Sequence, residues 1–172
     1  MIKLKDIFEN EAIDQVFQIY CDLDGVLADF DKRFEYFAGM SPSEYEKAFG
    51  TKKFWELIDE KVGVKFWTGI PWMSDGKTLW EFLQPHNPIL LSAPSRNESS
   101  KMGKRIWVKR NMPETKLILA SRGNKQNYSD KSNILIDDRL DTIEEWRARG
   151  GIGIHHTSAA STIAQLKKLG FK

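Results

Sequence analysis

Five short apolar segments recur along the chain, each about as long as a β-strand. They cover residues 16–21, 88–92, 116–120, 133–136 and, with a weaker pattern, 151–156. Each is rich in leucine or β-branched residues and ends in polar residues, glycine or proline. Uninterrupted apolar segments of this kind are typical of strands that are buried on both faces of a parallel sheet.

Helical patterns lie between these segments. Helices are predicted over residues 74–83, 99–110, 142–149 and 161–169, the last with Ser161 as its N-cap. Because strands and helices alternate with short connections, the sequence predicts an α/β fold with a Rossmann-like, doubly wound parallel sheet.

One long stretch departs from this alternation. Residues 31–73 show no good strand pattern and are predicted to be helical and rich in aromatic side chains. We therefore expect a core made of residues 16–30 and 74–172, with residues 31–73 inserted as a small helical cap over one end of the sheet. Residues 1–15 are a separate N-terminal extension to which the sequence assigns no role.

Length and composition narrow the class of protein. A chain of 172 residues suffices for one well-cored domain with a small insertion. No apolar stretch approaches the roughly 20 residues of a membrane span, and the first residues lack the apolar core of a signal peptide, so we expect a cytoplasmic protein. A single cysteine, Cys21, cannot form an internal disulfide. A net charge of only +2 favours small-molecule partners over nucleic acid or a membrane.

Side chains suited to metal and phosphate binding follow four of the apolar segments. They are Asp22 and Asp24 after the first, Ser92 and Ala93 at the end of the second, Lys125 after the third, and Asp137 and Asp138 after the fourth. Two carboxylates as close as Asp22 and Asp24 repel each other, and their burial is costly unless a cation compensates. In open α/β sheets the ligand site lies at the carboxyl ends of the strands. The sequence therefore predicts a Mg²⁺ site with phosphate-binding groups beside it.

In this order, the motifs resemble those of the haloacid dehalogenase-like hydrolase superfamily. The resemblance spans roughly residues 16–169 and rests on DLDGV at 22–26, LLSA at 90–93, a lysine after the third segment, and ILIDD at 134–138. A DxD pair alone is a weak signal, but its combination with the later DD pair is strong. More narrowly, DLDGVLADF, the KxxWV pattern at 104–108 and LIDDR are similar to the 5'(3')-deoxyribonucleotidases, including their bacterial and phage members.

The resemblance implies a Mg²⁺-dependent phosphomonoesterase that hydrolyses (deoxy)ribonucleoside monophosphates through an aspartyl-phosphate. Asp22 would be the nucleophile, and Asp24 would act first as general acid and then as general base. The metal would be held by Asp22, the backbone carbonyl of Asp24 and Asp138, with Asp137 in contact only through water. The resemblance leaves open which member of the last pair binds the metal directly.

Phosphate contacts are also implied by the resemblance. Ser92 would bond a phosphoryl oxygen, and Lys125 would neutralise the charge of the phosphate. Lys131 is the alternative to Lys125 because the loop that holds both is long. Ala93 stands where related nucleotidases often carry a second hydroxyl. One hydrogen bond to the phosphate is therefore missing or is supplied by Ser95.

The remaining candidates line the substrate pocket or flank it. Lys104 is expected to bond the phosphate, with an exposed helix lysine as the alternative. Phe30, Phe66 and Trp67 stand where related nucleotidases wall the base pocket, although most aromatic side chains belong to a core. Arg139 either contacts the nucleotide or pairs with the acid two residues later.

Two other functions are consistent with part of the pattern. One is a 3'-phosphatase that acts on nucleic-acid ends, which the modest net charge and the cap disfavour. The other is a non-catalytic protein that binds metal or nucleotide, which is less favoured because the chain supplies both a nucleophile and an acid/base. Base and sugar preference, the choice of 5' over 3' phosphate and the oligomeric state, a homodimer included, stay open.

Overall fold

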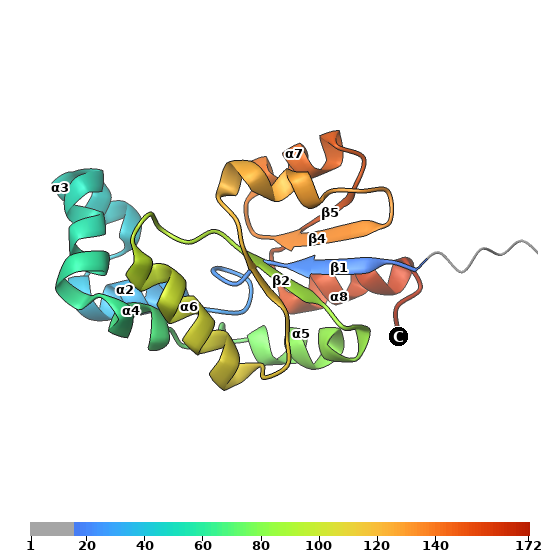
Figure 1. Cartoon of the computed structure of the whole chain (residues 1–172), viewed down its shortest axis with the longest axis horizontal. Coiled ribbons are helices and arrows are strands. Elements are labelled where there is room, and N and C mark those ends of the chain that lie inside the picture. The colour runs from blue at the N-terminus through green and yellow to red at the C-terminus, as the bar shows by residue number, and fades with distance from the viewer. Residues whose placement is uncertain (1–15) are drawn as a thin grey trace, which may run out of the picture.

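A parallel β-sheet forms the centre of the molecule (Figure 1). The computed structural model describes residues 16–172, and the predicted extension over residues 1–15 lies outside the described residues. Within the described part of the chain, five strands lie in the order β3-β2-β1-β4-β5: β1 (Gln18–Cys21), β2 (Ile89–Ser92), β3 (Leu117–Leu119), β4 (Asn133–Asp137) and β5 (Ile152–His155). Every neighbouring pair is parallel, which confirms the predicted doubly wound sheet.

Helices cover both faces of this sheet. On one face the core includes residues of α5 (Gly76–Leu83), α6 (Glu98–Asn111) and α8 (Ala159–Lys168), and on the other face α7 (Leu140–Ala148) packs. Because successive strand residues point to opposite faces, Ile19 and Cys21 belong to the first core and Tyr20 belongs to the second. Among residues 16–172, no helix has the length and apolar character needed to cross a membrane.

The segment between β1 and α5 is helical, as its sequence predicts. It contains α2 (Phe30–Ala38), α3 (Pro42–Trp55), the π-helix η1 (Glu56–Val62) and α4 (Val64–Thr68). Aromatic rings pack these helices together, and the centroids of Phe34 and Phe54 lie 4.8 Å apart. In Figure 1 the helices lie beyond the carboxyl end of β1, next to α6. The assignment of residues 31–73 as a separate cap stays a prediction.

The start of α8 differs from the predicted one because a distant contact decides it. The helix begins at Ala159, and its N-cap is Ser158, whose side chain accepts a hydrogen bond from the backbone N–H of Ser161. The prediction of Ser161 as the cap is therefore wrong. The backbone N–H of Ala159 donates to Asp75 Oδ2 at 2.7 Å, and this acceptor, 84 residues away, satisfies an N–H of the first turn.

Candidate functional site

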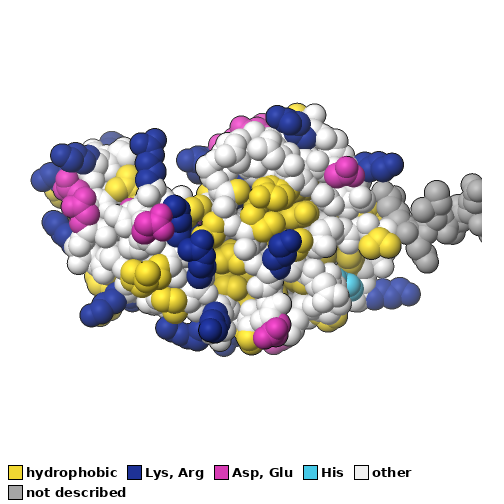
Figure 2. Space-filling model, in the orientation of Figure 1, with side chains coloured by type: hydrophobic (Ala, Val, Ile, Leu, Met, Phe, Trp, Pro, Cys, Tyr) yellow, Lys and Arg dark blue, Asp and Glu magenta, His cyan; other side chains and the backbone are white. Residues whose placement is uncertain are grey.

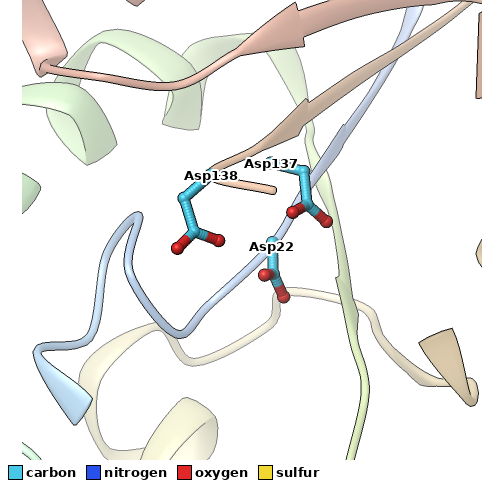
Figure 3. Close-up of side chains that lie close together, drawn as sticks. All are labelled: Asp22, Asp137 and Asp138. Carbon is cyan, nitrogen blue, oxygen red and sulfur yellow. The ribbon is translucent and has the colours of Figure 1, made fainter. Parts of the chain in front are cut away.

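Three carboxylates meet at the carboxyl end of the sheet (Figure 3). Asp22 directly follows β1, and Asp137 ends β4. The two aspartates lie side by side because the parallel register pairs the residues that precede them, Cys21 and Ile136. Together with Asp138 they each place one carboxylate oxygen within 4.8 Å of the other two. The fold thus brings together acidic residues from two separate apolar segments.

The turn after β1 leaves room for the third carboxylate. Gly25 has a left-handed backbone with φ of 78°, which glycine adopts at little cost. A Cβ at this position would collide with the carboxylate of Asp138. The glycine of the DLDG sequence therefore serves both the turn and the close approach of Asp138.

Lys125 lies against two of these carboxylates. Its ammonium is 2.7 Å from Asp137 Oδ2 and 3.1 Å from Asp22 Oδ1, and the side chain is almost fully buried. Burial opposes the charged form, but the two carboxylates outweigh it and raise the pKa of Lys125, which keeps the ammonium protonated. Lys131, the alternative from the sequence, is exposed and does not line the cavity at this site.

The pKa values of two carboxyls in the cluster are raised. Burial, together with the charges of Asp22 and Asp137, raises the pKa of Asp138 to about 7. Burial and the charge of Asp22 raise the pKa of Asp137 to about 6, although Lys125 opposes the shift. The positive charge of Lys125 therefore neutralises the negative charge of the three carboxylates only in part. Hard oxygen donors with excess negative charge are what Mg²⁺ prefers, so these residues fit the predicted metal.

A second lysine holds the other aspartate of the DLDG sequence. The ammonium of Lys104, on α6, lies 2.5 Å from Asp24 Oδ2 and 3.0 Å from Ser92 Oγ. Lys104 is 2% exposed, so the alternative of an exposed helix lysine is wrong. Asp24, Lys104 and Ser92 thus form one polar group beside the carboxylate cluster.

The loop after β2 lies at the edge of this group. Ala93 and Ser95 both line the cavity described below. The Ser95 hydroxyl donates to Asp59 Oδ1 at 3.1 Å, so in this structure it is engaged by the helical segment. Its use as a substitute for the missing second hydroxyl stays a prediction.

A cavity of about 1130 Å³ extends from the carboxylates to the helical segment. Asp22, Asp24, Lys125 and Asp138 line one part, and Phe30, Phe54, Trp55 and Trp67 line another. The cavity therefore has a charged end next to the sheet and an aromatic end whose rings stand among charged side chains such as Lys52 and Glu56. A ligand that carries an anionic group on a flat apolar body matches both.

The predicted aromatic walls divide into two kinds. Phe30 and Trp67 line the cavity, with ring centroids 5.8 Å apart. Phe66 is fully buried, 5.2 Å from the Phe30 ring, and does not line the cavity. The expectation that Phe66 walls the pocket is corrected: adjacent residues of a helix point in different directions, and only Trp67 faces the cavity.

Three arginines line the cavity: Arg96, Arg122 and Arg139. Arg139 lines it and also pairs with Asp141, with its Nη2 atom 3.0 Å from the carboxylate. The expected pairing with Asp141 is therefore confirmed, and contact with a nucleotide stays a prediction. Arg122 was not predicted, although it lies in the same loop as Lys125 and just after β3, a position that could have revealed it. Asp59 was also missed, and no local sequence pattern marks it.

Comparison with known proteins shows the fold. No family model and no curated protein matches the chain. It is similar to the solved structure of a hydrolase from Streptococcus pneumoniae TIGR4, with 16% identity over 89% of this chain and 99% of that chain and a TM-score of 0.56. It is also similar to a HAD-family enzyme from Bacteroides thetaiotaomicron, solved as a magnesium complex, with 16% identity over 90% and 99% of the two chains and a TM-score of 0.53.

A haloacid dehalogenase-like family hydrolase from Streptococcus pneumoniae is similar at 12% identity, over 88% of this chain and 91% of that chain, with a TM-score of 0.50. Together with the sheet order and the flanking helices, these likenesses define the architecture. The chain has the Rossmann-like core of the haloacid dehalogenase-like fold, as its four motifs predict.

Proposed function

We propose that the protein is a Mg²⁺-dependent phosphomonoesterase that hydrolyses (deoxy)ribonucleoside monophosphates through an aspartyl-phosphate. One observation carries the proposal: two aspartates, one residue apart, have different partners at one end of the sheet. Asp22 belongs to the carboxylate cluster with Lys125, whereas Asp24 is held outside it by Lys104. Two carboxylates in different surroundings can take different roles in one reaction.

The environment of Asp22 suits a nucleophile. One of its oxygens would attack phosphorus while the bond from phosphorus to the leaving oxygen breaks, which leaves the phosphoryl group on Asp22. Lys125, 3.1 Å from Asp22 Oδ1, would neutralise the charge that this transfer concentrates. Mg²⁺, held by Asp22, Asp138 and the carbonyl of Asp24, would neutralise the phosphate and orient it when bound.

The hydrogen bonds of Asp137 support an indirect role in metal binding. Its Oδ1 accepts from the backbone N–H of Arg139 at 2.9 Å, and its Oδ2 accepts from Lys125 at 2.7 Å. Within residues 16–172, the side chain of Asp138 makes no such bond to another residue, and only its own backbone N–H lowers the pKa of its carboxyl by hydrogen bonding. We therefore assign direct ligation to Asp138 and contact through water to Asp137.

Asp24, which lies beside Lys104 and Ser92, would act as the acid/base. Its carboxyl would donate a proton to the leaving alkoxide, and the resulting carboxylate would then take a proton from the water that hydrolyses the aspartyl-phosphate. Lys104 and Ser92, 3.0 Å apart, would together bind one phosphoryl oxygen. Each step thus has a donor and an acceptor among these residues.

The aromatic end of the cavity supports a nucleoside as the leaving group. Phe30 and Trp55, the more exposed of the four rings that line it, would offer ring surface to a flat base, with Phe54 and Trp67 packed behind them. Arg122 and Arg139, at the rim, offer donors to sugar or base. A nucleic-acid end is less well supported, since the net charge is only +2 and acidic side chains stand among the basic ones on the face shown in Figure 2.

A panel of phosphate esters tests the proposal. Phosphate release is measured from nucleoside 5'- and 3'-monophosphates and from an oligonucleotide with a 3'-phosphate, each with Mg²⁺ or with EDTA. We expect Mg²⁺-dependent release from the monophosphates, and a higher Mg²⁺ requirement for Asp138→Asn but not for Asp130→Asn, an exposed control outside the cavity. Folded protein that releases no phosphate from any nucleoside monophosphate contradicts the proposal, and activity on the oligonucleotide alone favours the 3'-phosphatase.

A further inference from the structure

One carboxylate oxygen joins the helical segment to the core. Asp59, on η1, accepts three hydrogen bonds at its Oδ1 atom: from Trp67 Nε1 at 3.3 Å, from Ser95 Oγ at 3.1 Å and from Ser99 Oγ at 3.2 Å. The donors lie on α4, in the loop after β2 and on α6. Asp59 therefore fixes three parts of the molecule relative to one another.

Trp67 is confined on its other side by α6. A Cβ on Gly103 would overlap the Cβ of Trp67, so the glycine allows α4 to approach α6 closely. Trp67 is 2% exposed, and the centroid of its ring lies 5.0 Å from the ammonium of Lys104. This is the geometry of a cation–π contact.

The same ammonium contacts the candidate acid/base. Lys104 reaches Asp24 and Ser92 through a flexible four-carbon stem, which holds its position only if something confines it. The Trp67 ring supplies one wall. The contacts thus form a continuous path from Asp59 through Trp67 and Lys104 to Asp24.

We propose that Asp59 is a positioning residue of this site, which holds the Trp67 ring in the place where it confines the Lys104 ammonium between Asp24 and Ser92. Asp59 does so as a hydrogen-bond acceptor, since a single oxygen of its carboxylate accepts all three hydrogen bonds. The inference rests on the proposed function, because it takes Lys104, Asp24 and Ser92 as the groups that act on the phosphate.

A double-mutant cycle tests whether Asp59 acts through Lys104. We expect Asp59→Ala to lower kcat/KM for p-nitrophenyl phosphate roughly 10- to 100-fold, as a small misplacement of a catalytic group does. In the Lys104→Met background the same change should have almost no further effect, because the ammonium that Asp59 positions is gone. A purely structural role of Asp59 would instead give two losses that multiply, and this result would overturn the inference.

Two further variants separate geometry from folding. Asp59→Asn keeps an acceptor oxygen for all three donors, so we expect its kcat/KM to stay near the wild-type value, and a loss equal to that of Asp59→Ala would contradict the inference. The matched control is Glu35→Ala, which removes an acidic side chain from an exposed position of α2 outside the cavity. We expect this control to leave kcat/KM unchanged. Circular dichroism confirms that each variant is folded.

A failure of the inference about Asp59 can be told apart from a failure of the proposed function. If wild-type protein hydrolyses p-nitrophenyl phosphate but no nucleotide, the nucleotide substrate is wrong and the cycle still decides the role of Asp59. If it hydrolyses no phosphate ester, the same cycle is measured as thermal stabilisation by orthovanadate with Mg²⁺. The inference would then be overturned if Asp59→Ala reduced this stabilisation by the same amount in the wild-type background and in the Lys104→Met background.

Discussion

Lys104 and Lys125 divide the carboxylates of the site between them. Lys125 contacts Asp22 and Asp137, whereas Lys104 contacts Asp24. Both lysines are almost fully buried, and a buried charge is stable only when it is paired and hydrogen-bonded. At this scale the meeting of Asp22, Asp137 and Asp138 was predictable, because they stand at the ends of apolar strands, and their roles stay a prediction. It could not predict Asp59, because the partners of its carboxylate lie 8, 36 and 40 residues away.

The raised pKa values of Asp137 and Asp138 predict a pH-dependent response to metal. The pKa of Asp138 rises from 3.8 to about 7 in the folded protein, so the folded state binds more protons than the unfolded state between these values. Stability of the metal-free protein should therefore fall as pH rises through this window. Mg²⁺ needs deprotonated ligands, so its stabilising effect should grow over the upper part of the same window.

Thermal unfolding between pH 5.5 and 8, with Mg²⁺ or with EDTA, measures this response. We expect the increase in Tm caused by Mg²⁺ to be small at the acidic end and larger at the basic end, and to shrink throughout in Asp138→Asn. An increase in Tm that is the same at every pH, or that persists in Asp138→Asn, would refute the assignment of Asp138 as a ligand.

Packing of α4 against α6 decides which aromatic side chains face the cavity. Phe66 and Trp67 are neighbours on α4, and their sequence gives no reason to prefer one as a wall. The close approach at Gly103 constrains the rotation of α4, in which both side chains are buried but only Trp67 reaches the wall of the cavity. Strands were predictable because each is apolar on both faces, whereas this rotation depends on a contact between segments about 36 residues apart in sequence.

Gly103→Ala tests this packing. The added methyl group would overlap Trp67, and overpacking of this kind costs about 1–3 kcal/mol, which exceeds the roughly 0.5–1 kcal/mol that alanine gains over glycine inside a helix. Urea denaturation should therefore show a lower free energy of unfolding. Gly123→Ala is the control, since nothing lies within 4 Å of a Cβ there. Equal stability of the two variants would show that α4 does not press on α6.

On the scale of the whole molecule, the cavity lies between the end of the sheet and the helical segment. Its charged end is lined by the loops that follow β1, β2, β3 and β4, and the rings of its aromatic end come from α2, α3 and α4. The convergence of the loops was predictable, because parallel strands present their carboxyl ends at one edge. A helical cap over one end of the sheet was also expected, but the contacts that fix its position, such as the Asp59 hydrogen bonds, follow no sequence pattern.

A phosphoenzyme on Asp22 separates a hydrolase from a protein that only binds its ligand. Wild-type protein and Asp22→Asn are mixed with Mg²⁺ and a nucleoside monophosphate that carries radiolabelled phosphate, quenched in acid, and mapped by peptide. We predict label on the peptide that contains Asp22 in the wild type, none in Asp22→Asn, and turnover of the folded variant lowered at least about 10³-fold. Label on another residue, or an Asp22→Asn variant that turns over at the wild-type rate, would contradict the proposed function.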